Sequence, residues 1–383
     1  MSVRAHWGHG LLSVWVVLQV AAMPAQAQSS YDFVELRSAW LATSELTNPQ
    51  SGKMAVGPSG VVVGSVRKIT GYVPDIFSFK FVPVYAVSAT QWPAGSGNPS
   101  TLATPAGTVS SATSGTVARA IDASGRVAGL RHINAPEGFV APQPVLWVQG
   151  APMVLSPQYG SAEAVHAMGG VVGYRLRGAA EVPVVNGITL AGVRQAVAWR
   201  DGAHADLHPP GLPTSVSSEA VAVNGLGQIA IVTRDTLTSR PGACYLYNQG
   251  VFQVLPTPTG AGCRITGLNE LGVAVGELRP AGSDQEQGVW WPNGQMQSLP
   301  TGFTPTGINR SGLVVGRTAA GAAVWKPGAA VQALTGRVKG VPSGAQIVDV
   351  LDVNDQGRMT VAAHFPKSGG GQTVRWGVVT PQK

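Results

Sequence analysis

A basic residue recurs directly after a short apolar run that is repeated along the chain. The seven residues are Arg67, Arg131, Arg175, Arg234, Arg279, Arg317 and His364. Converging guanidinium groups can hold carboxylate, sulfate or phosphate groups through paired hydrogen bonds. If the repeats close into a ring, these side chains surround one mouth of a central channel and form a ligand-binding site for anions. The alternative is that they are solvated charges, neutralised by carboxylates such as Asp235 and Glu277.

Other residue types that could do chemistry form weaker patterns. Five carboxylates could face the channel and supply an acid/base pair of the glycosidase kind. They are Asp122, Glu163, Glu219, Asp349 and Asp352. His204 and His208 have the spacing of zinc ligands on a helix, but the glycine turn before them and the prolines after them favour a strand or loop. No calcium loop, phosphate loop or nucleophile turn is recognisable, so we predict no catalytic residue, no metal and no cofactor.

The chain contains two cysteines, Cys244 and Cys263. In an exported protein they could form a disulfide, which would stabilise the fold by about 3 kcal/mol by closing a short loop. They could equally be two small buried apolar residues. The sequence leaves both possibilities open, because it does not show whether the two Cβ atoms meet.

The elements that position these residues belong to a repeat with a period of about 40–65 residues. Its signature is small–x–apolar–(Asn/Asp)–x–x–Gly–x–apolar–x–Gly. The copies begin at Ala55, Ala120, Ala164, Ala222, Gly267, Gly307 and Asp352. Each is followed by an aromatic residue, namely Trp92, Trp147, Trp199, Tyr247, Trp291, Trp325 and Trp376. Short apolar runs separated by Asn/Gly and Pro/Gly turns predict four antiparallel strands per copy.

Two positions of the repeat have a mechanical explanation. The Asn or Asp can accept hydrogen bonds from backbone N–H groups two residues on, which closes a turn. We therefore interpret Asp122, Asn224, Asn269, Asn309 and Asn354 as turn formers rather than ligands. The tryptophans are interpreted in the same way, as residues that pack the repeats together.

Four strands per copy and seven copies predict an all-β, seven-bladed β-propeller that forms one domain over residues 28–383. The 65-residue interval between the first two copies leaves room for an extra hairpin, so the sequence alone leaves a count of six, seven or eight blades open. Few charged residues (12%) and many glycines (50) and prolines (28) agree with this class. The seventh copy lacks its last strand, because the sequence ends at Lys383. The segment 31–36 alternates like a strand and has no hairpin partner, so we expect it to close the ring by pairing with the seventh blade.

The first 27 residues have the features of a cleavable signal peptide. Arg4 precedes an apolar stretch at 11–23, and Ala25-Gln26-Ala27 is a small-residue cleavage site. The apolar stretch is too short for an ordinary membrane span. We expect a mature chain that begins at Gln28, is secreted or periplasmic, and has no transmembrane segment.

With these motifs the chain resembles the HAF-repeat extracellular protein family. The matching segments are GINRSGLVVG with AAVWKPG, GLNELGVAVG with GVWWPNG, and AIDASGRVAG with PVLWVQG. The histidine that the family carries before its Ala-Phe-Leu-Trp motif is absent from these copies. The resemblance covers essentially the whole mature chain, and it implies a secreted repeat protein without an assigned enzymatic activity.

The segments between the second and third strands of each blade vary in length and lie on one face, where binding usually develops. They are residues 66–84, 131–144, 174–194, 234–242 and 278–287. We therefore predict a monomeric binding module whose ligand is an anionic polysaccharide or cell-surface component. The alternatives are a polysaccharide hydrolase or lyase, and a scaffold that presents loops to a protein partner, with segment 76–81 as its candidate contact surface. Nucleic acid is disfavoured, because the basic residues are dispersed.

Overall fold

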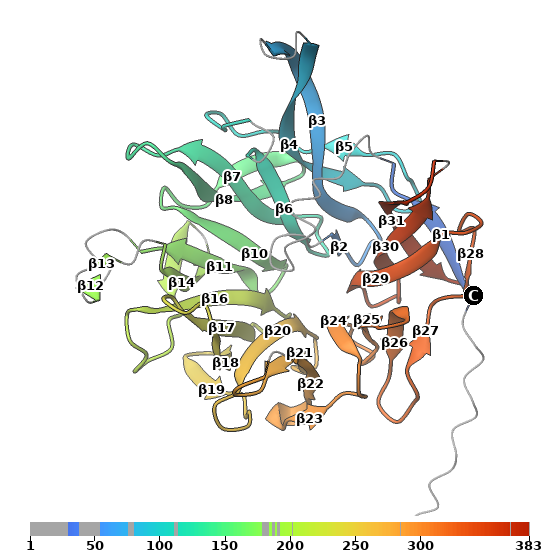
Figure 1. Cartoon of the computed structure of the whole chain (residues 1–383). Helices are drawn as coiled ribbons and strands as arrows, with labels where there is room; N and C mark the ends of the chain where they lie inside the picture. The colour runs from blue at the N-terminus through green and yellow to red at the C-terminus, as the bar shows by residue number, and fades with distance from the viewer. Residues whose placement is uncertain are drawn as a thin grey trace, which may run out of the picture.

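The computed structural model describes residues 30–37, 54–75, 80–110, 114–177, 184–185, 188–189, 192–200, 202–283, 285–367 and 369–382. Seven antiparallel sheets stand around a central axis and form a seven-bladed β-propeller (Figure 1). This confirms the predicted fold class. The predicted signal peptide lies outside the described residues.

Blades 1 to 6 are four-stranded and follow the chain, with the first strand of each nearest the axis (Figure 1). Blade 1 comprises β2 (Ala55–Val56), β3 (Val62–Asp75), β4 (Lys80–Trp92) and β5 (Ser100–Thr101). Blade 2 comprises β6 (Thr116–Ile121), β7 (Val127–Asn134), β8 (Val140–Val148) and β9 (Ala151–Val154). Blade 3 comprises β10 (Gly160–His166), β11 (Gly170–Leu176), β14 (Arg194–Arg200) and β15 (Ala203–Asp206), with a separate small hairpin of β12 (Val184–Val185) and β13 (Ile188–Thr189).

Blade 4 comprises β16 (Val216–Val223), β17 (Ile229–Asp235), β18 (Pro241–Asn248) and β19 (Val251–Val254). Blade 5 comprises β20 (Gly262–Leu268), β21 (Ala274–Arg279), β22 (Gln287–Trp291) and β23 (Gln297–Ser298), with a 3₁₀ turn, η2 (Pro292–Gly294). Blade 6 comprises β24 (Thr304–Ile308), β25 (Val314–Thr318), β26 (Gly321–Trp325) and β27 (Gln332–Ala333).

Blade 7 is assembled from both ends of the described chain. Its strands are β29 (Gln346–Val353), β30 (Met359–Pro366), β31 (Gln372–Pro381), β1 (Tyr31–Glu35) and β28 (Val338–Lys339). β1 runs antiparallel to β31, with Phe33 opposite Val379, which confirms the predicted closure of the ring. The short parallel strand β28 on the other edge of β1 was not predicted. It leaves the closing strand hydrogen-bonded on both sides.

A β-bulge occurs at one equivalent position in the inner strand of blades 2 to 7. The bulged residues are Arg119, Glu163, Val221, Thr266, Thr306 and Leu351. A bulge re-aims its side chain and brings the two backbones close together. This explains the last glycine of the repeat signature. A Cβ atom at Gly129, Gly173, Gly276 or Gly316 would overlap a carbonyl oxygen of the inner strand.

The Asn position of the repeat does more than form a turn. The Oδ1 of Asn224 accepts hydrogen bonds from the N–H groups of Leu226 (3.1 Å) and Gln228 (3.0 Å), as predicted. In addition, each Asn donates from Nδ2 to the carbonyl oxygen at the equivalent position of the next blade. The bonds are Asn224→Asn269 (3.0 Å), Asn269→Asn309 (3.1 Å), Asn309→Asn354 (3.1 Å) and Asn354→Gly57 (2.9 Å). The last of them spans the ring closure.

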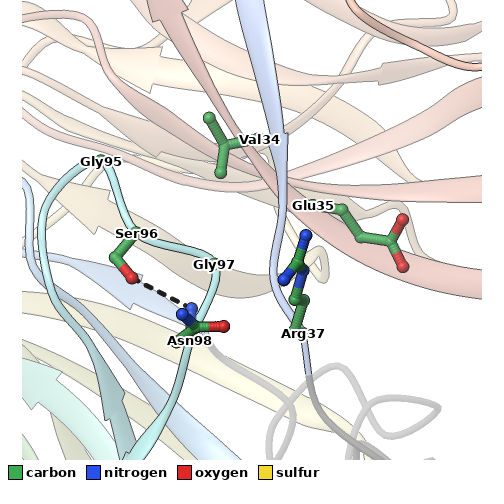
Figure 2. Close-up of a pocket in the computed structure, with 7 residues that line it drawn as sticks. All are labelled: Val34, Glu35, Arg37, Gly95, Ser96, Gly97 and Asn98. Atoms are coloured by element: carbon green, nitrogen blue, oxygen red, sulfur yellow. Dashed lines mark hydrogen bonds between the residues drawn. The ribbon is translucent and has the colours of Figure 1, made fainter.

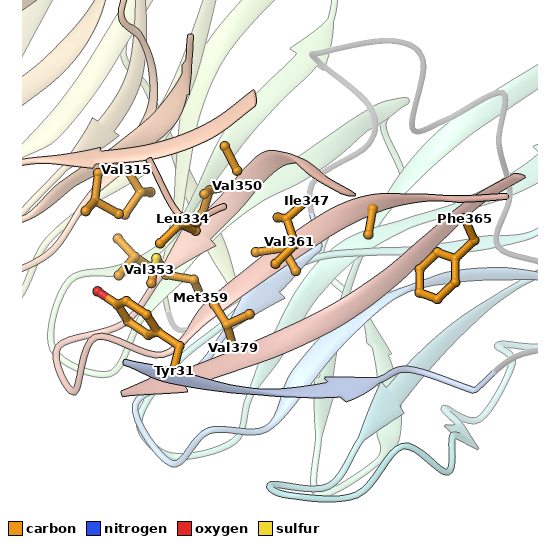
Figure 3. Close-up of a cluster of buried hydrophobic side chains, with 13 residues drawn as sticks. Tyr31, Val315, Leu334, Ile347, Val350, Val353, Met359, Val361, Phe365 and Val379 are labelled. Carbon is orange, nitrogen blue, oxygen red and sulfur yellow. The ribbon is translucent and has the colours of Figure 1, made fainter. Parts of the chain in front are cut away.

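The hydrophobic core lies between blades. All six repeat tryptophans are buried, which confirms their packing role. The indole Nε1 of Trp147 donates to Ala103 in the link from blade 1, and that of Trp291 to Pro256 in the link from blade 4. Between blades 6 and 7, Tyr31 of the closing strand packs with Leu334 and Met359 in one buried cluster (Figure 3). Burial of this cluster therefore depends on the N-terminal strand.

Two predicted loops are instead mainly regular structure. β7 and β8 pair as far as Asn134 opposite Val140, so the predicted loop 131–144 is reduced to residues 135–139. β3 and β4 pair from Val62 opposite Trp92 to Asp75 opposite Lys80, and the ribbon extends away from the ring (Figure 1). The prediction of a loop at 66–84 was wrong because the prolines and glycine of this stretch read as breakers, whereas a bulge near Gly71 accommodates the irregularity within the ladder. Residues 76–79 of the proposed partner-binding segment lie outside the described residues.

Candidate functional site

The inner strands surround a cavity of about 220 Å³ at the centre of the ring. The bulged side chains reach it, as do residues of the turns between the first and second strands. Its charged lining residues are Arg119, Glu163, Glu270, Asp352 and Asp355. The cavity therefore combines one guanidinium with four carboxylates, in a chain whose formal net charge is +7.

Ion pairs join neighbouring blades, and one of them lines the central cavity. The pairs are Arg119–Glu163, Arg194–Glu219 and Arg317–Asp349, with closest nitrogen–oxygen distances of 3.8, 2.8 and 3.3 Å. A fourth pair, Arg264–Glu277, lies within blade 5. Both side chains of the Arg119–Glu163 pair are largely buried (8% and 13% exposed), so removing one of them would leave the other charge uncompensated, at a cost of about 3–5 kcal/mol. The pairs thus contribute to the alignment of the blades.

Tyr174 of β11 is buried among several charged side chains. The guanidinium of Arg194 lies 4.4 Å from the centre of the Tyr174 ring. Burial raises the pKa of Tyr174 to about 12, with Arg194 acting in the opposite direction. Burial lowers the pKa of Arg194, but Glu219, Tyr174 and Glu163 together outweigh this and hold the pKa above its ordinary value. Both side chains therefore keep their neutral-pH protonation states.

Two carboxyl groups on the opposite side of the ring behave differently. Burial raises the pKa of Glu277, although Arg264 acts against the shift. Burial also raises the pKa of Asp349, and Arg317 opposes it. For these two carboxyl groups, desolvation raises the pKa by more than the neighbouring guanidinium lowers it.

The predicted basic residues of blades 2 to 7 lie in the second half of the second strand, toward the variable segments, whereas Arg67 lies in the middle of β3, opposite Val87. Arg131 and Arg175 are held within their own blades. Arg131 donates from Nε to Gln143 (2.8 Å) and also bonds the carbonyl oxygen of Ala106. Arg175 is buried, with Nε 3.2 Å from Asp206 and Nη2 2.8 Å from Gln195. Their guanidinium groups serve the structure of blades 2 and 3.

The other basic residues point differently. To compare the blades, we take as reference the residue of the second strand that pairs with the inner-strand residue immediately before the bulge. Arg131 and Arg175 lie two positions beyond it, whereas Arg234, Arg279 and His364 lie three positions beyond it and Arg317 one. Strand side chains alternate with a period of two, so these two groups face opposite sides of their blades. Arg279 and Arg317 are exposed, while Arg67, Arg234 and His364 are half-buried. The structure thus places six of the seven residues toward the same end of their strands but divides their directions.

The predicted channel carboxylates each have a partner. Glu163 and Asp352 line the cavity, and Asp352 accepts a hydrogen bond from the N–H of Val56 at 2.9 Å. Glu219 and Asp349 are ion-paired as described above. Asp122 lies in its turn instead, bonded to the Nε of Arg126 at 2.7 Å. These contacts hold blades and turns together.

The two histidines with zinc-like spacing are separated by the structure. His204 lies in β15, as a strand was favoured over a helix, and is exposed. His208 follows the strand and its Nδ1 lies 2.9 Å from the hydroxyl of Ser218. Among the described residues, no three His, Cys, Asp or Glu side chains are grouped to hold a metal ion. The described part of the chain also has no helix of membrane-spanning length and apolarity.

Cys244 and Cys263 form a disulfide with a Cα–Cα distance of 5.7 Å. It connects β18 of blade 4 with β20 of blade 5 and is buried.

A second cavity, of about 420 Å³, lies where the ring closes, between β1 and the loop after β4 (Figure 2). Its wall consists largely of the backbone of Gly95 and Gly97, opposite Glu35 and Arg37. The cavity thus lies at the junction between blades 7 and 1.

Sequence reasoning missed the channel positions of Arg119, Thr266 and Thr306. The signal was available, because the bulged residue always directly precedes the first residue of the repeat signature. The Arg264–Glu277 pair was missed too, since its partners are on different strands.

Comparison with solved structures finds propellers with little sequence similarity. The β-propeller domain of the trilobed protease from Pyrococcus furiosus, described as having an open velcro topology, is 10% identical with a TM-score of 0.39, and the match covers 80% of this chain and 96% of that one. The tricorn protease is 10% identical with a TM-score of 0.21, over 85% of this chain and 39% of that one. No protein-family model and no curated protein matches. The fold assignment rests on the sheet topology itself.

Proposed function

We propose that this chain is an exported binding module whose variable face recognises an anionic glycan or cell-envelope component. The observation that carries the proposal is the pair of exposed arginines, Arg279 and Arg317, on adjacent blades 5 and 6. By their positions after the bulge they point to the same side of their blades, near the segments between the second and third strands. Arg234 of blade 4 continues the series.

The chemistry of these residues supports an anionic ligand. An arginine presents a planar fork of donors that matches carboxylate and sulfate groups. The side chain of Arg317 is 56% exposed while it is paired with Asp349, so donor atoms remain accessible to a ligand. Acidic glycans carry such groups at regular intervals, and an exported protein would encounter them at a cell surface.

The test is a glycan-array screen of the mature protein at low and physiological salt, followed by affinity measurements on two double variants. We expect hits confined to acidic glycans, weakened by salt because exposed charges are screened. Arg279→Gln/Arg317→Gln should raise Kd by about tenfold, since each exposed charge contact contributes up to about 1 kcal/mol.

The matched control is Arg310→Gln/Arg358→Gln, which removes the same charge from the turns on the opposite face. It should leave Kd within about twofold. Equal weakening by both double variants would show that only net charge matters, and would refute a site at Arg279 and Arg317. The absence of any acidic-glycan hit at low salt would refute the ligand class.

A further inference from the structure

The tips of the turns between the first and second strands differ around the ring. Their third residues are Ser59, Ser124, Met168, Leu226, Leu271, Ser311 and Gln356. The three apolar ones belong to the consecutive blades 3, 4 and 5, and are 74%, 63% and 65% exposed. An apolar side chain that stays in water contributes nothing to folding. Three in succession at equivalent positions therefore indicate a surface that is covered by something else.

A groove of about 580 Å³ lies on the same face, between blades 2 and 3. Its floor includes the buried side chains of Leu146 and Trp199. Its walls include Met153, which is 50% exposed, and Met168 of the first apolar tip. Methionine side chains are flexible and polarisable, and they adapt to partners of different shape. The volume falls within the range of about 300–1,000 Å³ that is usual for binding sites.

The charged groups that line this groove are all cationic among the described residues. Arg126 lines it, and its partner Asp122 has a side chain with no exposed surface, so the pair presents only the guanidinium. Arg200 is exposed, and its Nη2 donates to the carbonyl oxygen of Met168 at 3.2 Å. Methionine, arginine and aromatic residues are enriched in protein–protein interfaces, whereas Asp, Glu and Lys are depleted.

We propose that the groove between blades 2 and 3 binds a segment of a partner protein in which one or two large apolar side chains stand next to a carboxylate. The apolar group enters between Met153 and Met168, over Trp199. The carboxylate pairs with Arg200. Leu226 and Leu271 extend the contact across blades 4 and 5. A concave site with a buried aromatic floor suits a peptide segment, whereas a bilayer surface would engage only the protruding tips.

The test selects peptides from a displayed random library against the mature full-length protein and measures Kd for the winners by fluorescence anisotropy. We expect winners that carry a large apolar residue beside Asp or Glu. Met153→Ser/Met168→Ser should raise Kd at least tenfold. The matched control is Leu237→Ser, which replaces a side chain that is 55% exposed on the opposite face, and it should leave Kd unchanged. The same selection against the folded Arg200→Glu variant should instead enrich peptides in which Lys or Arg stands beside the large apolar residue.

Three results would overturn the proposal. One is a selection that enriches no peptides competing with one another for a single site. Another is equal binding of the winners to wild type and to Met153→Ser/Met168→Ser. The third is binding of wild type to phosphatidylglycerol vesicles that is lost in Leu226→Ser/Leu271→Ser but kept in the methionine variant, which would assign this face to lipid. The glycan site lies on the other face, so its success or failure is measured independently.

Discussion

The chain of asparagine hydrogen bonds between blades can be broken by exchanging a single atom. Asn309→Asp keeps the oxygen that accepts from the N–H of Leu313 at 3.0 Å, and so preserves the turn. It replaces the Nδ2 donor that bonds the carbonyl oxygen of Asn354 at 3.1 Å. In the variant two acceptors face each other at a site where Asn309 is 4% and Asn354 5% exposed.

The magnitude follows from these contacts. An unsatisfied buried carbonyl costs about 1–3 kcal/mol, and the new charge adds to it, so we expect a loss of about 3 kcal/mol in the free energy of unfolding. With an unfolding entropy of about 2.1 cal/mol/K per residue over about 350 residues, this corresponds to a decrease in Tm of about 4 °C. The assay is thermal unfolding followed by tryptophan fluorescence.

The chain supplies its own control. In blade 2 the position holds Asp122, and Arg126, four residues on, bonds this Asp and donates from Nη2 to the carbonyl oxygen of His166 at 2.9 Å. Blade 7 has Arg358 at that position, whereas blade 6 has Leu313. Asn354→Asp should therefore lower Tm by only about 1 °C, because Arg358 can take over both contacts. Equal losses in the two variants, or an unchanged Tm for Asn309→Asp, would refute the reasoning.

Three further predictions concern stability. Burial raises the pKa of Glu277, so the stabilising contribution of this group is present at low pH and is lost as pH rises through that pKa. In urea titrations, the free energy of unfolding of Glu277→Gln relative to wild type should therefore increase between about pH 4 and about pH 7. A decrease would contradict this. Replacing both cysteines by Ala opens a link between residues 19 apart and should cost about 3 kcal/mol in guanidinium titrations, and an unshifted midpoint would contradict it. Gly173→Ala places a Cβ against the carbonyl oxygen of Ser161 and should cost more than about 2 kcal/mol, whereas Gly369→Ala, with no atom nearby, should leave Tm unchanged.

Local sequence patterns predicted much of the fold. The Asn turn, the aromatic third strand and the spare N-terminal strand are properties of short segments, and each appears in the structure where the sequence placed it. The ribbon of β3 and β4 was missed, because its prolines and glycine are tolerated only where a bulge and an exposed edge accommodate them. The candidate site was located less well. A recurring Arg marks an end of a strand, but the number of residues after the bulge decides which side of the blade it faces.

The sequence by itself determined the repeat and the manner of closure, since hydrogen-bonded strands and turns are encoded over a few residues. It left the number of blades open, and the structure shows seven. Only the tertiary structure decided which charges face each other. Arg119 meets Glu163, and Asn354 meets Gly57, because the ring brings together residues that are far apart in the chain. Their partners lie in neighbouring blades, and no spacing within one repeat records that contact.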